Sequence, residues 1–252
     1  MTLSPSVLFI ICPLVFLAGF VDAVAGGGGL ISLPAYLVAG LPIHLAYGTN
    51  KFAMLLGTSM STAKYLHSGH VRLRPALVAA AGALAGSWAG AQLALMLDER
   101  YLRYCLMVIL PLAAVFLLFN RNFGSTPRRQ PAPARLYPLC LLCGVVIGAY
   151  DGFFGPGTGT FLILAFTFLG FDLITASGNA KVVNLASNLA AVVAFGSGGS
   201  VLLWVGIPAA LCAIAGGYLG ARMAINRGAA FIRPVVGAVV TLLLARILWD
   251  LF

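Results

Sequence analysis

Charged side chains are scarce in this sequence. They account for 8% of its 252 residues, whereas apolar residues account for 61%, and the mean hydropathy is +1.03. A soluble globular protein needs many more polar side chains than this to cover its surface. The composition therefore excludes a soluble globule and predicts an integral membrane protein.

Residues that carry enzyme chemistry are also few. The chain has six acidic residues, three histidines and five cysteines. It contains no Ser-His-Asp set, no pair of catalytic carboxylates and no phosphate-binding GK[ST] loop, so we do not expect an enzyme. His67 and His70 flank a loop without further metal ligands, so we expect neither a metal site nor another cofactor. The cysteines are odd in number and lie in apolar segments, which gives no disulfide framework.

Ten apolar runs, separated by short turns or charged residues, fill the chain. A helix that crosses a membrane needs about 20 residues. The runs 30–43 and 157–170 are shorter than this and each follows a glycine-rich break, so we expect half-helices or re-entrant segments there. The other runs are 6–25, 46–67, 73–97, 101–119, 136–153, 175–196, 203–225 and 231–252.

The basic residues lie in the loops between the apolar runs. The net charge of +9 does not gather on one basic face, so we do not expect binding of nucleic acid. Four arginines lie in the linker 121–135, and the positive-inside rule places this linker on the cytoplasmic side of the cell's inner or plasma membrane. Both termini are then outside, and the linker separates transmembrane repeats at 1–120 and 136–252.

The two halves of the chain are similar in sequence. The segment GFVDAVAGGGG (19–29) aligns with GAYDGFFGPGT (148–158) at an offset of 129, and AYGTNKFAMLL (46–56) aligns with ASGNAKVVNLA (176–186) at an offset of 130. Each half holds five apolar runs, and repeats with an odd number of crossings insert upside down relative to each other. The sequence therefore predicts an all-α membrane protein of two inverted-topology repeats, an architecture typical of secondary transporters.

The glycine breaks form the first part of the predicted site. Glycine lets the backbone unwind and approach a ligand closely, and non-helical backbone inside a membrane is tolerated where it lines a cavity or is buried in protein. A half-helix that starts after such a break presents free N–H groups and the positive end of its dipole, which favours an anion. The glycines assigned to the site are Gly26, Gly27, Gly28, Gly29, Gly155, Gly157 and Gly159.

Four charged residues lie inside the apolar runs at equivalent positions, namely Asp22 and Asp151 before the breaks and Lys51 and Lys181 after them. A charge at the bilayer centre costs on the order of 2.5–3.5 kcal/mol, so these residues need partners. In one interpretation each aspartate pairs with a lysine and joins the halves. In the other, the lysines coordinate an anion while the aspartates orient them or carry a proton, and both can hold together. The remaining residues assigned to the anion site are Thr49, Asn50, Asn179, Asn184 and Asn188.

The segments 19–51 and 148–181 resemble the two signature regions of the TauE/SafE family of sulfite exporters. Both contain a D-x₃-G-x-G pattern followed by the later lysine, and the resemblance extends over almost the whole chain. It implies a membrane permease that moves a small sulfur-containing anion, such as sulfite or an organosulfonate.

The sequence thus predicts a secondary transporter of such an anion that works by alternating access, with protons as candidate coupling ions. One alternative is an anion channel on the same scaffold. Another is a membrane component that transfers sulfur through Cys140 and Cys143, which lie one helical turn apart. The opposing interpretation of these cysteines is that they are small residues that pack a membrane helix.

Overall fold

The computed structural model describes residues 4–98, 100–102, 104, 129–232 and 234–235. Within these residues the chain forms helices and no strands, which confirms the predicted all-α class. Most of the predicted runs 101–119 and 231–252, and most of the linker 121–135, lie outside the described residues. The helices are α1 (Val7–Ala25), α2 (Gly29–Val38), α3 (Ile43–His67), α4 (Leu73–Met96), α6 (Pro133–Phe153), α7 (Thr158–Phe168), α8 (Leu173–Ser197) and α9 (Leu203–Arg227).

Five of these helices are long and apolar enough to cross a membrane, namely α1, α4, α6, α8 and α9. The helix α3 is as long as α8, but it carries Asn50, Lys51 and Lys64 among several hydroxyl side chains. The helices α2 and α7 have only 10 and 11 residues. The prediction that a short helix follows each glycine break is therefore confirmed, because neither helix reaches the length of a full span.

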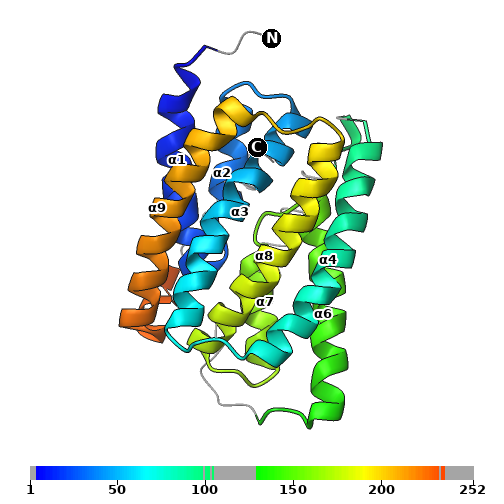
Figure 1. Cartoon of the computed structure of the whole chain (residues 1–252), viewed down its shortest axis with the longest axis vertical. Helices are drawn as coiled ribbons and strands as arrows, with labels where there is room; N and C mark the ends of the chain where they lie inside the picture. Colours follow the sequence, from blue (N-terminus) through cyan, green and yellow to red (C-terminus); the bar gives the residue numbers. More distant parts are fainter. Residues whose placement is uncertain (1–3, 99, 103, 105–128, 233, 236–252) are drawn as a thin grey trace.

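The helices of the two halves are interleaved (Figure 1). The central helices α3 and α8 pack against each other, the pair α1 and α9 lies beside α3, and the pair α4 and α6 lies beside α8. The first long helix of each half thus packs on the last described helix of the other half. Equivalent helices make equivalent contacts, which is the arrangement expected of a repeated sequence.

Glycines at equivalent positions allow each central helix to contact closely the loop that follows the other central helix. A Cβ atom on Gly48 would lie 2.0 Å from the carbonyl oxygen of Ser200, and a Cβ atom on Gly178 would lie 2.0 Å from that of His70. Both glycines and both carbonyl groups are related by the offset of 130 found in the sequence. A larger side chain at either position would push the two backbones apart.

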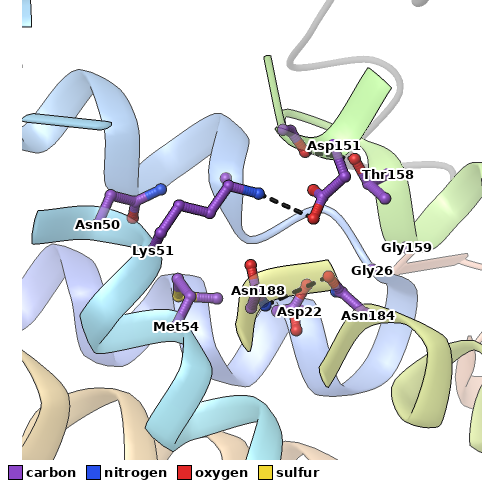
Figure 2. Close-up of a pocket in the computed structure, with 12 residues that line it drawn as sticks. Asp22, Gly26, Asn50, Lys51, Met54, Asp151, Thr158, Gly159, Asn184 and Asn188 are labelled. Atoms are coloured by element: carbon purple, nitrogen blue, oxygen red, sulfur yellow. Dashed lines mark hydrogen bonds and ion pairs between the residues drawn. The ribbon is translucent and has the colours of Figure 1, made fainter. Parts of the chain in front are cut away.

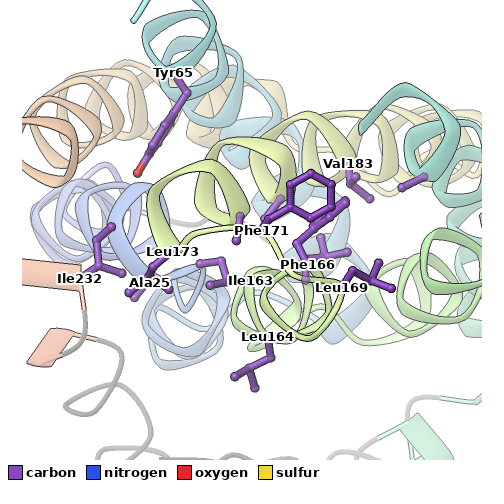
Figure 3. Close-up of a cluster of buried hydrophobic side chains, with 14 of the residues drawn as sticks. Ala25, Tyr65, Ile163, Leu164, Phe166, Leu169, Phe171, Leu173, Val183 and Ile232 are labelled. Atoms are coloured by element: carbon purple, nitrogen blue, oxygen red, sulfur yellow. The ribbon is translucent and has the colours of Figure 1, made fainter. Parts of the chain in front are cut away.

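Apolar side chains hold the short helix α7 against α8 (Figure 3). Ile163 and Phe166 on α7 are buried, and Phe166 meets Phe171 edge to face with ring centroids 5.7 Å apart. Edge-to-face aromatic pairs of this kind add stability beyond the buried area. Phe166 lies near the end of α7 and Phe171 in the turn before α8, so this pair stabilises the connection between the two helices.

The substitution Gly178→Ala is expected to lower the free energy of unfolding by about 1–3 kcal/mol, because the new methyl group overlaps the His70 carbonyl group. Gly196→Ala on the same helix is the matched control, since a Cβ atom there meets nothing within 4 Å. Thermal unfolding in detergent should show a lower midpoint for the first variant alone. Equal midpoints would contradict the close contact.

Candidate functional site

The two glycine breaks meet in the middle of the molecule. Gly26 ends α1 with a φ of 76°, and its N–H group donates to the carbonyl oxygen of Asp22 at 2.8 Å. A Cβ atom on Gly26 would lie 2.1 Å from the carbonyl carbon of Gly159, at the start of α7. Thr160 donates its hydroxyl hydrogen to the carbonyl oxygen of Ala25 at 2.7 Å. The backbones of the breaks are in direct contact, and both the left-handed φ and the contact require glycine at position 26.

Two buried ion pairs connect the halves beside these breaks. Lys51 Nζ lies 2.8 Å from Asp151 Oδ2, and Lys181 Nζ lies 2.8 Å from Asp22 Oδ2. All four side chains are less than one-tenth exposed. The structure shows the pairing of the first interpretation, and each pair joins one half to the other. Together the four residues carry no net charge.

The two ion pairs have different surroundings although their sequences are equivalent. Lys181 Nζ also donates to the carbonyl oxygen of Asp22, at the last turn of α1, and Thr62 Oγ1 donates to the carbonyl oxygen of Lys181 at 3.1 Å. Asp151 Oδ2 instead accepts a hydrogen bond from the hydroxyl group of Ser187 on α8. Lys181 is therefore held by a main-chain carbonyl group of α1 as well as by the carboxylate.

A small cavity lies between the breaks and is lined by both halves (Figure 2). Its volume is about 20 Å³, which is room for one or two water molecules. Lys51 and both aspartates border it, whereas Lys181 does not. The lining residues are Asp22, Gly26, Gly29, Asn50, Lys51, Met54, Asp151, Gly155, Thr158, Gly159, Asn184 and Asn188.

All lining residues except Met54 and Thr158 belong to the set assigned from the sequence. The offsets of the repeat pair Met54 with Asn184 and Thr158 with Gly29, so the repeat alignment contained the signal for both. Thr158 starts α7 and donates its hydroxyl hydrogen to the carbonyl oxygen of Gly155 at 2.8 Å. It thereby shapes the second break.

Thr49 and Asn179, also assigned to the anion site, lie outside the cavity lining. Thr49 Oγ1 accepts from the backbone N–H of Leu202 at 2.9 Å, and Asn179 Oδ1 accepts from that of Arg72 at 2.8 Å. These contacts are equivalent, and each fixes the residue that precedes a helix, α9 or α4. The lining also leaves out Gly27, Gly28 and Gly157, which shape the breaks next to the lining glycines.

Three asparagines bring amide groups to the cavity. Asn188 Nδ2 donates to Asn184 Oδ1 at 3.3 Å. Asn50 is more than nine-tenths buried, and no described protein group bonds its Oδ1 atom. A buried polar atom without a partner costs about 1–3 kcal/mol. A polar ligand in the cavity would remove this cost, with the amide turned either way.

The cysteines of the CxxC pair lie on α6, and neither lines the cavity. Cys140 is fully buried in the apolar core that contains the α7 side chains, and Cys143 is partly buried. This location agrees with a packing role for Cys140.

The sequence comparisons identify the family of the chain. Residues 11–247 match the family model described as sulfite exporter TauE/SafE. The chain belongs to the TauE/SafE family. A probable membrane transporter protein, ORF9 of Sinorhizobium sp, is 37% identical over 93% of this chain and 90% of its own length. The probable membrane transporter protein YfcA of Escherichia coli is 33% identical over 98% of this chain and 91% of its own length. No solved structure was found to match.

The TauE/SafE assignment makes the chain a multi-pass membrane transporter and not an enzyme, in agreement with the apolar helices. The family match covers both glycine breaks and both ion pairs. Because the two ion pairs are buried and balance each other in charge, the transporter has a neutral polar cluster at the contact of its two halves.

Removal of one partner from a buried ion pair should destabilise this TauE/SafE transporter strongly. Lys181→Met leaves the Asp22 carboxylate unpaired and should cost about 3–5 kcal/mol, or roughly 10 °C in the unfolding midpoint. The double variant Lys181→Met with Asp22→Asn removes both charges and should recover most of this loss. Thermal unfolding of both variants in detergent tests the pair. A double variant as unstable as the single one would contradict it.

Proposed function

We propose that this protein is a secondary transporter that carries a small sulfur-containing anion, such as sulfite or an organosulfonate, by alternating access. The observation that carries the proposal is the buried cavity at the contact of the two glycine breaks. Lys51 is the only cation among its described lining residues. The sulfur-containing class is taken from the family description.

Lys51 is the proposed centre of the anion site. Its ammonium group already lies at the cavity wall, and the amides of Asn50, Asn184 and Asn188 supply further hydrogen-bond donors around the same space. An ammonium group and several amide donors can together replace the water shell of an oxyanion. Lys181 is assigned a structural role, because it is fully buried, bonds the end of α1 and does not line the cavity.

The starts of the two short helices supply the proposed backbone part of the site. Gly29 begins α2 and Gly159 lies in the first turn of α7, and both line the cavity. The N–H groups in the first turn of a helix have no helical partner and favour an anion. The neighbouring glycines Gly26 and Gly155 allow this backbone to come close to the ligand, and Asp22 and Asp151 balance the charge.

The small size of the cavity favours a carrier over a channel. A space of about 20 Å³ holds water but not a sulfur oxyanion, so the anion enters only when Lys51 leaves Asp151 and the walls move. Such a gated site between two halves fits alternating access, whereas a channel needs a continuous open path.

The equivalent contacts of the two halves support an inverted repeat with units at 1–120 and 136–252. We place this repeat in the inner or plasma membrane, with the linker 121–135 in the cytoplasm and both termini outside, on the basis of the arginines in the linker.

The double variant Lys51→Met with Asp151→Asn should reach the membrane folded but lose transport, because it lacks the cation of the cavity and leaves no carboxylate unpaired. We expect the uptake of radiolabelled anion into proteoliposomes to fall by about 10- to 100-fold, since a hydrogen bond to a charged group contributes about 1.5–3 kcal/mol.

Lys64→Met on the same helix is the matched control. Lys64 lies 5.3 Å from the centre of the Tyr218 ring and does not line the cavity, so uptake should stay near the wild-type rate. Wild-type uptake by the Lys51 variant would exclude the proposed site.

The substrate is tested with radiolabelled sulfite, thiosulfate, sulfate, sulfoacetate and taurine, each offered in turn to proteoliposomes that contain the wild-type chain. We expect saturable uptake of at least one anion, which speeds up when the same unlabelled anion is inside. Flux that does not saturate and shows no exchange would indicate a channel. If none of the anions moves, the sulfur-anion assignment is wrong.

A further inference from the structure

The two ion pairs are equivalent in sequence, but only one of them can change its partners at the cavity. Lys181 is fully buried and holds both the carboxylate and the carbonyl oxygen of Asp22. Lys51 borders the cavity, and its carboxylate partner Asp151 borders it too. We propose that Asp151 is the proton site of the transporter and takes up one proton when Lys51 turns to the anion, while Lys181 and Asp22 stay paired. This inference rests on the proposed function.

The net charge of the site is the first reason to expect a proton. The four charged residues at the breaks sum to zero, so a monoanion that enters the buried cavity leaves one uncompensated negative charge. The four side chains around it are buried, so this charge has to be compensated inside the protein. One proton bound in the same step restores neutrality. The step forms one O–H bond on a carboxylate and breaks none in the protein.

The choice between the two carboxylates follows from their partners. Asp22 keeps Lys181 when the anion enters, whereas Asp151 loses the ammonium group of Lys51. The other charged or titratable groups that face Asp151 are Asp22, across the cavity on α1, and Tyr150 on α6. The Tyr150 hydroxyl group donates to the carbonyl oxygen of Pro156 at 2.6 Å. Asp151 is thus the carboxylate left without a cation.

Ser187 gives Asp151 a partner for both protonation states. The hydroxyl group now donates to the Asp151 carboxylate, and it also lies 3.4 Å from the carbonyl oxygen of Asn184. When Asp151 carries a proton, the carboxyl group donates to the serine oxygen, and the serine hydrogen turns to Asn184. The repeat places Gly57 at the position equivalent to Ser187, so Asp22 has no such hydroxyl partner there. The two halves therefore differ in the hydroxyl group that can hydrogen-bond the carboxyl group both with and without its proton.

The test uses the purified full chain in proteoliposomes with a proton gradient across the membrane and the same five labelled anions, each in turn. The wild-type chain should accumulate its monoanion about tenfold for each unit of pH difference, which is the gradient that one coupled proton supplies. A pH-sensitive dye inside the vesicles should record proton entry together with the label.

Asp151→Asn imitates the protonated carboxyl group permanently. This variant should lose accumulation, so that the label only equilibrates, while exchange against unlabelled anion stays measurable at a reduced rate. Asp151→Glu should keep the coupling. The matched control is Asp172→Asn, which neutralises an exposed carboxylate that caps α8 and does not line the cavity, and it should still accumulate the anion. Coupling that survives in Asp151→Asn, or that is lost equally in the control, would overturn the proposal.

The remaining outcomes distinguish a failure of the proposed function from a failure of this inference alone. If the wild-type chain transports no probe, both the proposed function and this inference fail. If it transports an anion with saturation and exchange but without response to the proton gradient, only this inference fails. Should Asp151→Asn not fold, infrared difference spectra of the wild-type and Asp151→Glu chains decide, because a carboxyl band of residue 151 shifts between the two. A protonated carboxyl band that appears when the transported anion is added supports Asp151, and its absence overturns the proposal.

Discussion

The burial of four charges at one place is the constraint on which the rest of the structure depends. Inside a membrane protein neither water nor lipid can neutralise Lys51, Lys181, Asp22 and Asp151, so they must neutralise one another. They do so in pairs that each take one partner from either half. The helices that carry these residues must therefore approach closely from both halves. The small residues at the helix contacts and the glycine breaks are what make this approach sterically possible.

The same constraint explains why the breaks are needed. The Lys181 ammonium group reaches the carbonyl oxygen of Asp22, in the last turn of α1, and the chain must end its helix there to turn into the contact with α7. Gly26 provides this end with a left-handed φ. The fold, the neutral charge and the cavity are thus consequences of one arrangement.

Much of this could be predicted from the sequence, because composition, apolar length and the repeat are properties of the chain itself. They were sufficient for the membrane class, for the short helices and for most of the residues that line the cavity. The different roles of Lys51 and Lys181 could not be predicted, since the two positions are equivalent in the repeat and differ only through three-dimensional neighbours. The roles of Thr49 and Asn179 were hidden for a similar reason. Each bonds the start of a helix that belongs to the other half of the chain.

The interleaving of the helices also has a consequence for the biogenesis of the protein. The helix α1 emerges from the ribosome first, but it packs mainly on α9, which is made near the end of synthesis. During translation its small-residue face is therefore exposed to lipid or to the insertion machinery until the second half arrives. Assembly is dominated by contacts between distant parts of the chain, which form slowly because long loops must close first. Among the described residues the largest helix contacts join the two halves, so this set of contacts forms only after α9 has been inserted.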